Sequence, residues 1–265
     1  MKTSALLFGL NYAGSDCALN GCINDVRNVK KYLQEALGFA DIAMFDDAAN
    51  RDRTSGAGIM RSLRELVAKS WAEQLDLVWI HYSGHGTSVR DASSEELDGK
   101  DECICPSDYS SAGLITDDAI SEVLRGVNPA TKVVCVFDCC HSGTIADLRW
   151  RYLDRRVRSQ ENARPDSRMA KTLLLSGCRD DQTSADAFGV GNTREFSGAL
   201  TSCLLGALRE RPALMGDALG LLEDVRRRLR MGGFEQVPQL CASYMLDQAA
   251  EPLLLPGMLP GPLPK

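Results

Sequence analysis

The stretch that decides the fold, residues 133–144, reads VVCVFDCCHSGT. It begins as an apolar, β-branched run, which is typical of a parallel strand that is buried on both faces. It ends in a carboxylate, two thiols, an imidazole and a Ser-Gly turn. Reactive side chains that follow a buried strand lie where open α/β sheets place their sites. The stretch therefore predicts an α/β fold and the position of its functional site.

A second stretch, residues 75–86, has the same design and reads LDLVWIHYSGHG. Its end at His85 and the cysteine at Cys140 are separated by 55 positions (85 to 140), which is enough for the crossover that parallel strands need. If the two strands are neighbours, His85 and the cysteines meet at one edge of the sheet. A thiol with an imidazole in reach is the minimum for nucleophilic catalysis by cysteine.

The bulk properties set limits on the class of protein. A chain of 265 residues with 44% hydrophobic residues can form one α/β domain with a sizeable core. A net charge of −6 lacks the basic footprint of nucleic-acid binding. We find no signal peptide and no long apolar span, so we expect no membrane contact. The ten cysteines contain no C-x-x-C pair and several lie in apolar runs, which favours reduced thiols and a cytoplasmic protein over a zinc site.

Strands and helices alternate along the rest of the chain. Apolar runs predict strands at 4–11, 42–45, 75–82, 133–138, 171–177 and 237–241, and helical spacing predicts helices at 26–37, 59–71, 117–125, 196–208 and 214–229. This alternation predicts a sheet with helices on its faces. Pro238 indicates that the last strand lies at an edge of the sheet. The acidic segment 90–118 is expected to be loop-like, with a small strand at 103–106, and the arginine-rich segment 149–168 is expected to be an exposed linker. The Pro/Leu-rich tail after Pro252 is expected to be ordered only where it packs.

Strand geometry separates the two adjacent cysteines. Alternate side chains of a strand share a face, so Asp138 and Cys140 point together and Cys139 points away. Cys140 is also nearer the loop, and we assign it as the nucleophile and Cys139 to packing. His85 is the candidate base, because the flanking glycines permit a close backbone approach and the amide of Gly86 could face an oxyanion; the alternative is an ordinary surface imidazole. His81 lies within the apolar run and is expected to be a packed histidine.

The acidic segment offers hard oxygen ligands of the kind that Ca²⁺ prefers. Asp98-x-x-Asp101 and Asp117-Asp118 lie near one strand end, although they do not form an EF-hand pattern. The alternative is a solvated acidic surface. From the spacing alone, both readings stay open.

Taken together, the motifs resemble the metacaspases. The resemblance rests on HYSGHG at 81–86, DCCHSG at 138–143 and ITDD at 115–118, which occur in the family's order between Leu6 and about Ser243. The short linker after the Cys140 segment resembles type I members, although the Pro/Gln-rich N-terminal extension often found in them does not precede the first strand here. Any one motif alone would be weak, and their joint occurrence at matching spacing is specific.

The resemblance implies a caspase-like fold with a mainly parallel central sheet between helices, and a Cys140/His85 dyad peptidase that cleaves polypeptides after Arg or Lys. It divides the single domain 1–265 into a large-subunit-like part (1–148), an exposed basic linker (149–170) open to self-cleavage, a small-subunit-like part (171–251) and a tail (252–265). We expect a monomer. The family's ligands for the cofactor Ca²⁺ match Asp101, Asp117, Asp118 and Asp147, and its substrate-pocket residues match Cys22, Asp25, Ser83 and Asp138.

Three alternatives remain at this point. The chain could be a catalytically silent, calcium-responsive scaffold with the peptidase fold. It could be a redox protein that uses Cys139 and Cys140, although adjacent cysteines bridge only with strain. A nucleotide-binding enzyme is weaker still, because the Gly-x-Gly pairs at 56–58 and 189–191 lack the rest of a phosphate loop. Asp25 also has a purely local alternative, as the cap of the helix predicted to begin at Val26.

Overall fold

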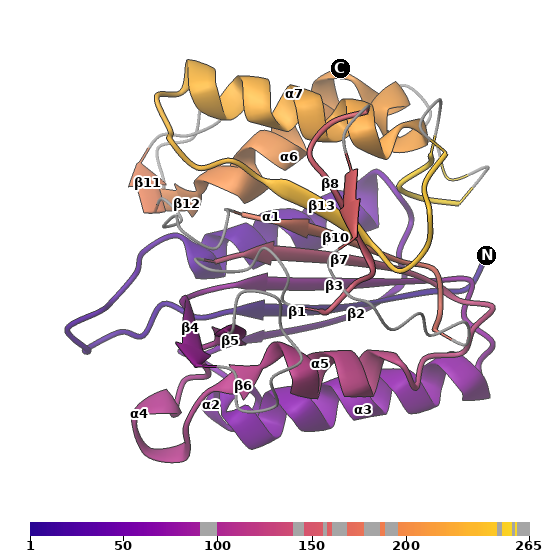
Figure 1. Cartoon of the computed structure of the whole chain (residues 1–265). Helices are drawn as coiled ribbons and strands as arrows, with labels where there is room; N and C mark the ends of the chain where they lie inside the picture. The colour runs from indigo at the N-terminus through magenta and orange to yellow at the C-terminus, as the bar shows by residue number, and fades with distance from the viewer. Residues whose placement is uncertain are drawn as a thin grey trace.

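The structure is a computed structural model that describes residues 1–90, 100–139, 146–155, 158–160, 169–177, 186–188, 196–247, 251–255 and 258. In this part of the chain an eight-stranded sheet lies between two layers of helices (Figure 1). The strand order is β2-β1-β3-β7-β10-β13-β8-β9. No helix of the described residues is both long and apolar enough to cross a membrane.

The first five strands of that order run parallel to one another. They are β2 (Asp41–Asp46), β1 (Thr3–Gly9), β3 (Leu77–Ser83), β7 (Lys132–Asp138) and β10 (Thr172–Ser176). The remaining three, β13 (Gln239–Ala242), β8 (Trp150–Tyr152) and β9 (Arg158–Gln160), add on antiparallel. The mainly parallel sheet confirms the predicted fold class. β3 and β7 are neighbours, as the two strand-end motifs required.

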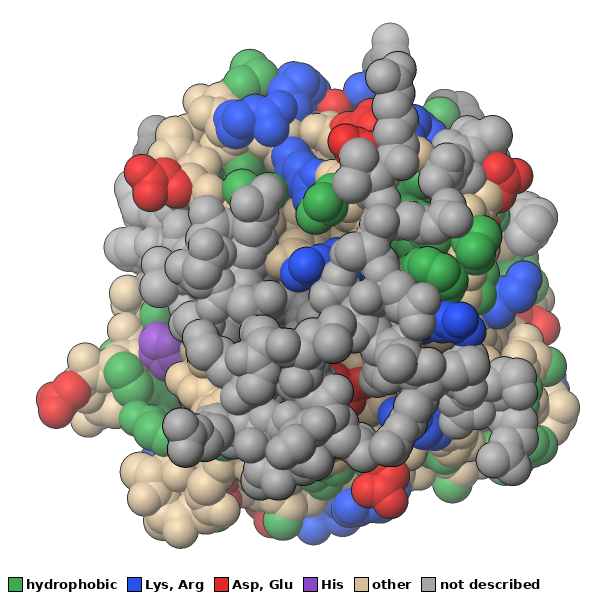
Figure 2. Space-filling model, in the orientation of Figure 1, with side chains coloured by type: hydrophobic (Ala, Val, Ile, Leu, Met, Phe, Trp, Pro, Cys, Tyr) green, Lys and Arg blue, Asp and Glu red, His purple; other side chains and the backbone are tan. Residues whose placement is uncertain are grey.

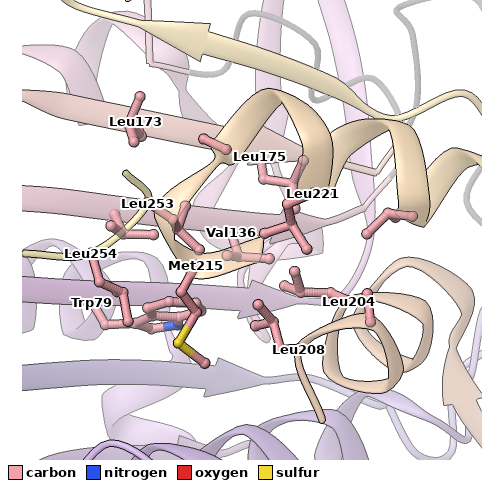
Figure 3. Close-up of a cluster of buried hydrophobic side chains, with 14 of the residues drawn as sticks. Trp79, Val136, Leu173, Leu175, Leu204, Leu208, Met215, Leu221, Leu253 and Leu254 are labelled. Carbon is pink, nitrogen blue, oxygen red and sulfur yellow. The ribbon is translucent and has the colours of Figure 1, made fainter. Parts of the chain in front are cut away.

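Alternation along the central strands builds one core on each face of the sheet. Trp79, Val136 and Leu175 point to one face, where α1 (Cys22–Glu35), α6 (Ala199–Glu210) and α7 (Ala218–Met231) cover them. Figure 3 shows Leu204 and Leu208 of α6, Leu221 of α7, and Leu253 and Leu254 of the tail gathered over these strands. Leu253 and Leu254 of the tail therefore belong to this core.

The second face carries α3 (Gly56–Ala72) and α5 (Asp117–Leu124), which pack on Val78, Ile80 and Cys135. A small three-stranded sheet of β4 (Gly86–Arg90), β5 (Lys100–Ile104) and β6 (Ile115–Thr116) lies at the end of β3, with the short helices α2 (Arg51–Thr54) and α4 (Tyr109–Ala112) beside it. The other short elements are β11 (Asp186–Phe188), β12 (Phe196–Gly198) and the 3-10 helix at Pro212–Gly216.

The structure corrects several boundaries. The segment expected to be loop-like at 90–118, with a small strand at 103–106, contains β5, α4 and β6, and β5 begins earlier than expected, at Lys100. The side chains of Asp101 and Glu102 are buried, so these polar residues do not mark a solvated loop. β13 is not an edge strand, since it pairs with β10 and β8, and Pro238 comes just before it. The predicted exposed linker is wrong at its start, because β8 pairs with β13 and the side chain of Tyr152 is fully buried.

A gathering of basic side chains over α7 is visible on the face shown in Figure 2. Arg211, Arg227 and Arg228 all bind the buried carboxylate of Asp224, at 2.6–2.9 Å. The pair of Arg211 with Asp224 joins the end of α6 to α7, and the other two pairs lie within α7. The arginine content of α7 is therefore explained in part by helix packing within the domain.

Candidate active site

The ends of β3 and β7 bring the two predicted motifs together. Ser83 and Asp138 are partners in the parallel register, and the amide of Gly84 donates to the carbonyl of Asp138 at 3.4 Å. Cys139 is fully buried in the core beneath α3 and α5, which confirms its packing role and keeps it away from a soluble oxidant. Cys140 itself lies outside the described residues. Its assignment as the nucleophile stays a prediction.

Two buried tyrosines hold the backbone of His85. The amide of His85 donates to the hydroxyl of Tyr12 at 3.0 Å, and the hydroxyl of Tyr82 donates to the carbonyl of His85 at 2.9 Å. The two hydroxyls lie 2.9 Å apart. Burial raises the pKa of both hydroxyls well above the usual value of tyrosine, so both remain protonated. A Cβ on Gly84 would stand 2.7 Å from the hydroxyl of Tyr82, which explains the glycine at this position.

The imidazole of His85 is oriented by a backbone carbonyl. Its Nε2 lies 2.6 Å from the carbonyl oxygen of Cys17, and its ring centroid lies 4.8 Å from that of Tyr12. A carbonyl oxygen can only accept, so Nε2 carries the proton and Nδ1 is left as an acceptor. The sequence shows no third residue for the dyad, because a backbone carbonyl has no side-chain signature.

The pairing of β4 with β5 sets the direction of the Gly86 amide. The amide of Cys105 donates to the carbonyl of His85 at 3.0 Å, so this pair is hydrogen-bonded in the β4–β5 ladder. Bonds of an antiparallel ladder fall on alternate pairs, and the pair of Gly86 with Ile104 is the next one. The amide of Gly86 therefore points away from β5.

A second cluster brings two predicted pocket carboxylates to one point. Asp25 and Asp138 are both buried, and a Cβ built on Gly198 would stand 2.7 Å from Oδ2 of Asp25 and 2.3 Å from Oδ2 of Asp138. The hydroxyl of Ser83 donates to Oδ2 of Asp25 at 2.6 Å. Three of the four predicted pocket residues thus meet, and Gly198 leaves the space that they need. Cys22, the fourth, is buried at the first position of α1.

The start of α6 supplies the partners of these carboxylates. The amide of Gly198 donates to both oxygens of Asp25 at 2.9 and 3.0 Å. The amide and the hydroxyl of Thr201 each donate to Oδ2 of Asp138 at 2.8 Å. All of these donors are neutral groups. The sequence analysis missed Gly198 and Thr201.

The alternative role of Asp25, as the cap of a helix that begins at Val26, is wrong. Helix α1 begins at Cys22 rather than at Val26, with Gly21 at its cap, so Asp25 lies within its first turn and points toward α6. His81 is fully buried, as expected, with Nε2 3.4 Å from the hydroxyl of Thr201. Burial lowers the pKa of His81 to about 3, so this imidazole is neutral.

The predicted calcium ligands are brought together only in part. Asp101 and Asp117 are buried on neighbouring segments, and Asp118 is exposed at the start of α5. Burial raises the pKa of Asp117 to about 6, and the charge of Asp101 adds to the rise. Asp147 lies on another segment, in a left-handed conformation with φ of 47°. Within the described ranges, no three His, Cys, Asp or Glu side chains are grouped so that they could hold a metal ion.

Comparison with known proteins agrees with this architecture. A family model described as metacaspase, peptidase C14 domain, matches residues 3–149. Metacaspase-1B of Aspergillus oryzae is 33% identical over 296 residues, which cover 93% of this chain and 69% of that protein. Metacaspase-2 of Trypanosoma brucei brucei is 36% identical over 267 residues, which cover 92% and 74%.

Solved structures give the same picture at the level of the fold. A crystal structure of a protein from Geobacter sulfurreducens matches with a TM-score of 0.67 and 26% identity, over 95% of this chain and 97% of that one. The structure of pro-sf-caspase-1 matches with a TM-score of 0.53 and 17% identity, over 93% and 88%. With relatives above 30% identity along more than nine-tenths of its length and a family model over more than half of it, this chain belongs to the metacaspases, a family of cysteine-type endopeptidases.

Proposed function

We propose that this cysteine endopeptidase cleaves polypeptides after Arg or Lys, with Cys140 as the nucleophile and His85 as the base. The observation that carries the specificity is the convergence of Asp25 and Asp138 beside Ser83, two residues before His85. Two buried negative charges favour a guanidinium or an ammonium and reject a carboxylate, which would add a like charge. Arg can engage a carboxylate through two parallel hydrogen bonds, while Lys offers a point charge.

The geometry around His85 supports its role as the base. With the proton of Nε2 held by the carbonyl of Cys17, Nδ1 takes the proton of the thiol and later gives it to the leaving amine. The hydroxyls of Tyr12 and Tyr82 fix the backbone on both sides of the imidazole. The outward amide of Gly86, together with the amide of Cys140, would bind the oxyanion; loss of one such donor typically costs ~100-fold or more in rate.

A panel of fluorogenic peptides that differ only in the residue before the scissile bond tests the proposal. We expect turnover with Arg and Lys, with Arg at least as good, and essentially none with Asp. The panel is run with and without Ca²⁺, and Cys140→Ala supplies the background rate. Efficient cleavage after Asp would contradict the assignment of the pocket.

The described residues fit a calcium site in part. Asp101 and Asp117 are adjacent buried carboxylates whose mutual repulsion contributes to the raised pKa of Asp117. A bound Ca²⁺ would supply positive charge that offsets this repulsion. We propose that these two residues hold the ion together with Asp118 and Asp147, and Asp147 would connect it to the segment that follows Cys140.

Calcium is therefore expected to activate the enzyme. We expect turnover of the Arg peptide to rise in calcium at millimolar levels, a range that is typical of weak calcium modules. Asp117→Asn is expected to weaken this response, because it removes the most buried of the four proposed ligands. Asp52→Asn, which removes an exposed carboxylate on α2, serves as the control. Equal turnover in chelator and in calcium would exclude the site.

We also propose that the chain cuts itself within the basic linker when calcium is present. Arg151 belongs to β8, whose backbone is paired with β13, and Arg155 binds Asp217. Arg158 belongs to β9, which pairs with β8. We therefore expect cleavage after the arginines that follow β9, Arg164 and Arg168, rather than at Arg151 or Arg158. The cut site is measured by mass spectrometry of wild type and Cys140→Ala after incubation with calcium, and we expect fragments from wild type alone. An intact wild-type chain after long incubation would refute self-cleavage, which activity need not require.

A further inference from the structure

A cavity of about 660 Å³ lies beside His85 and belongs to neither the acidic pocket nor the proposed calcium site. Its walls come from the loop after β1, the turn after β2 and the region of α4, with Tyr12, Cys17, Ala48 and Tyr109 among the lining residues. Figure 1 shows that the loop between β1 and α1 extends beyond the strand ends, on the same side as β4 and α4. The hydroxyl of Tyr109 lies 3.2 Å from the thiol of Cys17, which joins the loop to α4.

Two wall residues of this cavity also hold His85. Tyr12 accepts the hydrogen bond of the His85 amide, and the carbonyl of Cys17 lies 2.6 Å from the imidazole Nε2. The cavity therefore begins where the proposed base is anchored.

The cavity and the acidic pocket lie on opposite sides of the sheet plane. Asp25 and Asp138 meet beneath the start of α6, on the face that is covered by α1, α6 and α7. Tyr12, Cys17 and Tyr109 pack with the core of the other face, beneath α3 and α5. His85 follows β3 at the edge between the two.

The chemistry of peptide hydrolysis indicates which part of the substrate binds in the acidic pocket and which part binds in the cavity. A base that protonates the leaving amine must lie within hydrogen-bond reach of the amine nitrogen. The substrate residue before the scissile bond places its side chain in the acidic pocket, so the chain after the bond passes His85 and leaves on the other side. We infer that the cavity binds the segment of the substrate that follows the scissile bond; this inference rests on the proposed dyad and pocket.

The walls indicate how that segment is recognised. The volume falls within the ~300–1,000 Å³ that is typical of ligand sites, which is room for a few residues. Asp16, Asp47 and Arg51 line the cavity with charges of both signs, and Asp47 accepts hydrogen bonds from the amides of Asn11 and Tyr12. Recognition therefore depends on the shape and hydrogen bonding of an extended chain, with little selection for one charge.

Two substrates with the same Arg before the scissile bond separate this site from the rest of the enzyme. One ends in an aminocoumarin leaving group and has no residues after the bond; the other is a quenched fluorescent peptide with four residues after it. Ala48→Trp fills the cavity, and Ala49→Trp places the same side chain on the neighbouring exposed position, which does not line it.

We expect Ala48→Trp to raise KM and lower kcat/KM for the spanning peptide by about tenfold, as loss of ground-state binding does. Its cleavage of the aminocoumarin substrate, and both activities of Ala49→Trp, should stay at wild-type level. Ser110→Trp, with Ser111→Trp as its control, repeats the test from α4 in case the first variant does not fold.

Equal kcat/KM for the spanning peptide in wild type, Ala48→Trp and Ser110→Trp would overturn the inference. An equal loss with both substrates would also overturn it, because damage to His85 or to the fold affects both. Failure of the proposed function looks different, since wild type would then not cleave the Arg aminocoumarin substrate at all.

Discussion

Cys140→Ala and His85→Ala should each remove nearly all peptidase activity, by about 10⁴-fold or more, while Cys139→Ala keeps most of it. The first two changes remove the nucleophile and the base of one reaction step, so either loss alone disables it. Cys139 is fully buried in the core beneath α3 and α5, on the face of the sheet opposite to Asp138. The measurement is kcat/KM for an Arg peptide with calcium present.

A covalent probe of the thiol distinguishes lost chemistry from lost structure. Labelling should persist in Cys139→Ala, disappear in Cys140→Ala and slow in His85→Ala, because the base no longer assists formation of the thiolate. Thermal unfolding of all three variants reports on the fold. If Cys139→Ala were inactive and Cys140→Ala active, the assignment of the two cysteines would be reversed. A wild-type chain that neither reacts with the probe nor cleaves peptides would instead be the silent scaffold.

The second large effect is expected at the acidic pocket. Asp25→Asn and Asp138→Asn should each lower kcat/KM for Arg and Lys peptides by about 100-fold or more, because removing one partner of a buried charge pair costs about 2–5 kcal/mol. Asn keeps the shape of the side chain and can still accept the hydrogen bonds from Gly198 or Thr201. The loss should therefore depend on the charge of the substrate.

If these carboxylates had only a structural role, their substitution would lower the melting temperature without changing the cleavage of Arg and Lys peptides. Asp138 accepts from the amide of Thr201 in the first turn of α6, so it also acts as a cap for that helix. Asp217 caps α7 in the same way, through the amide of Gly220, and Asp217→Asn is the matched control. If Asp138→Asn changed only the melting temperature, as Asp217→Asn should, and left Arg cleavage intact, the pocket assignment would be wrong.

Gly198→Ala adds a steric test of the same pocket. The new Cβ would stand 2.3 Å from Oδ2 of Asp138, so the carboxylate must move or the start of α6 must shift. Both outcomes reduce cleavage after basic residues without changing any charge.

The sequence predicted the architecture of the sheet because its central strands carry two strong local signals. Long apolar runs marked β3 and β7, and the reactive residues at their ends fixed which edge holds the site. Strand alternation also placed Cys139 in the core and Asp138 on the opposite face, where it meets α6. These inferences need only the local pattern and the geometry of a parallel sheet.

The missed parts of the site depend on contacts that are distant in sequence or made by the backbone. Asp25 and Gly198 are 173 positions apart, and nothing near Asp25 indicates that its partner is the start of a later helix. The carbonyl of Cys17 would be the same atom in any residue. The sequence did not predict β8 for another reason. Its three residues lie in an arginine-rich segment, and they form a strand because they pair with β13 rather than because of their local composition.

The position of β8 has a topological consequence for a chain that is cut in its linker. β10 and β13 come after the proposed cut, yet they lie in the sheet between β7 and β8, which both come before it. A cut beyond β9 would thus leave two strands of the second fragment between two strands of the first. Each fragment would hydrogen-bond the other along two separate ladders, from β7 to β10 and from β8 to β13. The two pieces would therefore behave as one interlocked body, and their separation would require the sheet itself to come apart.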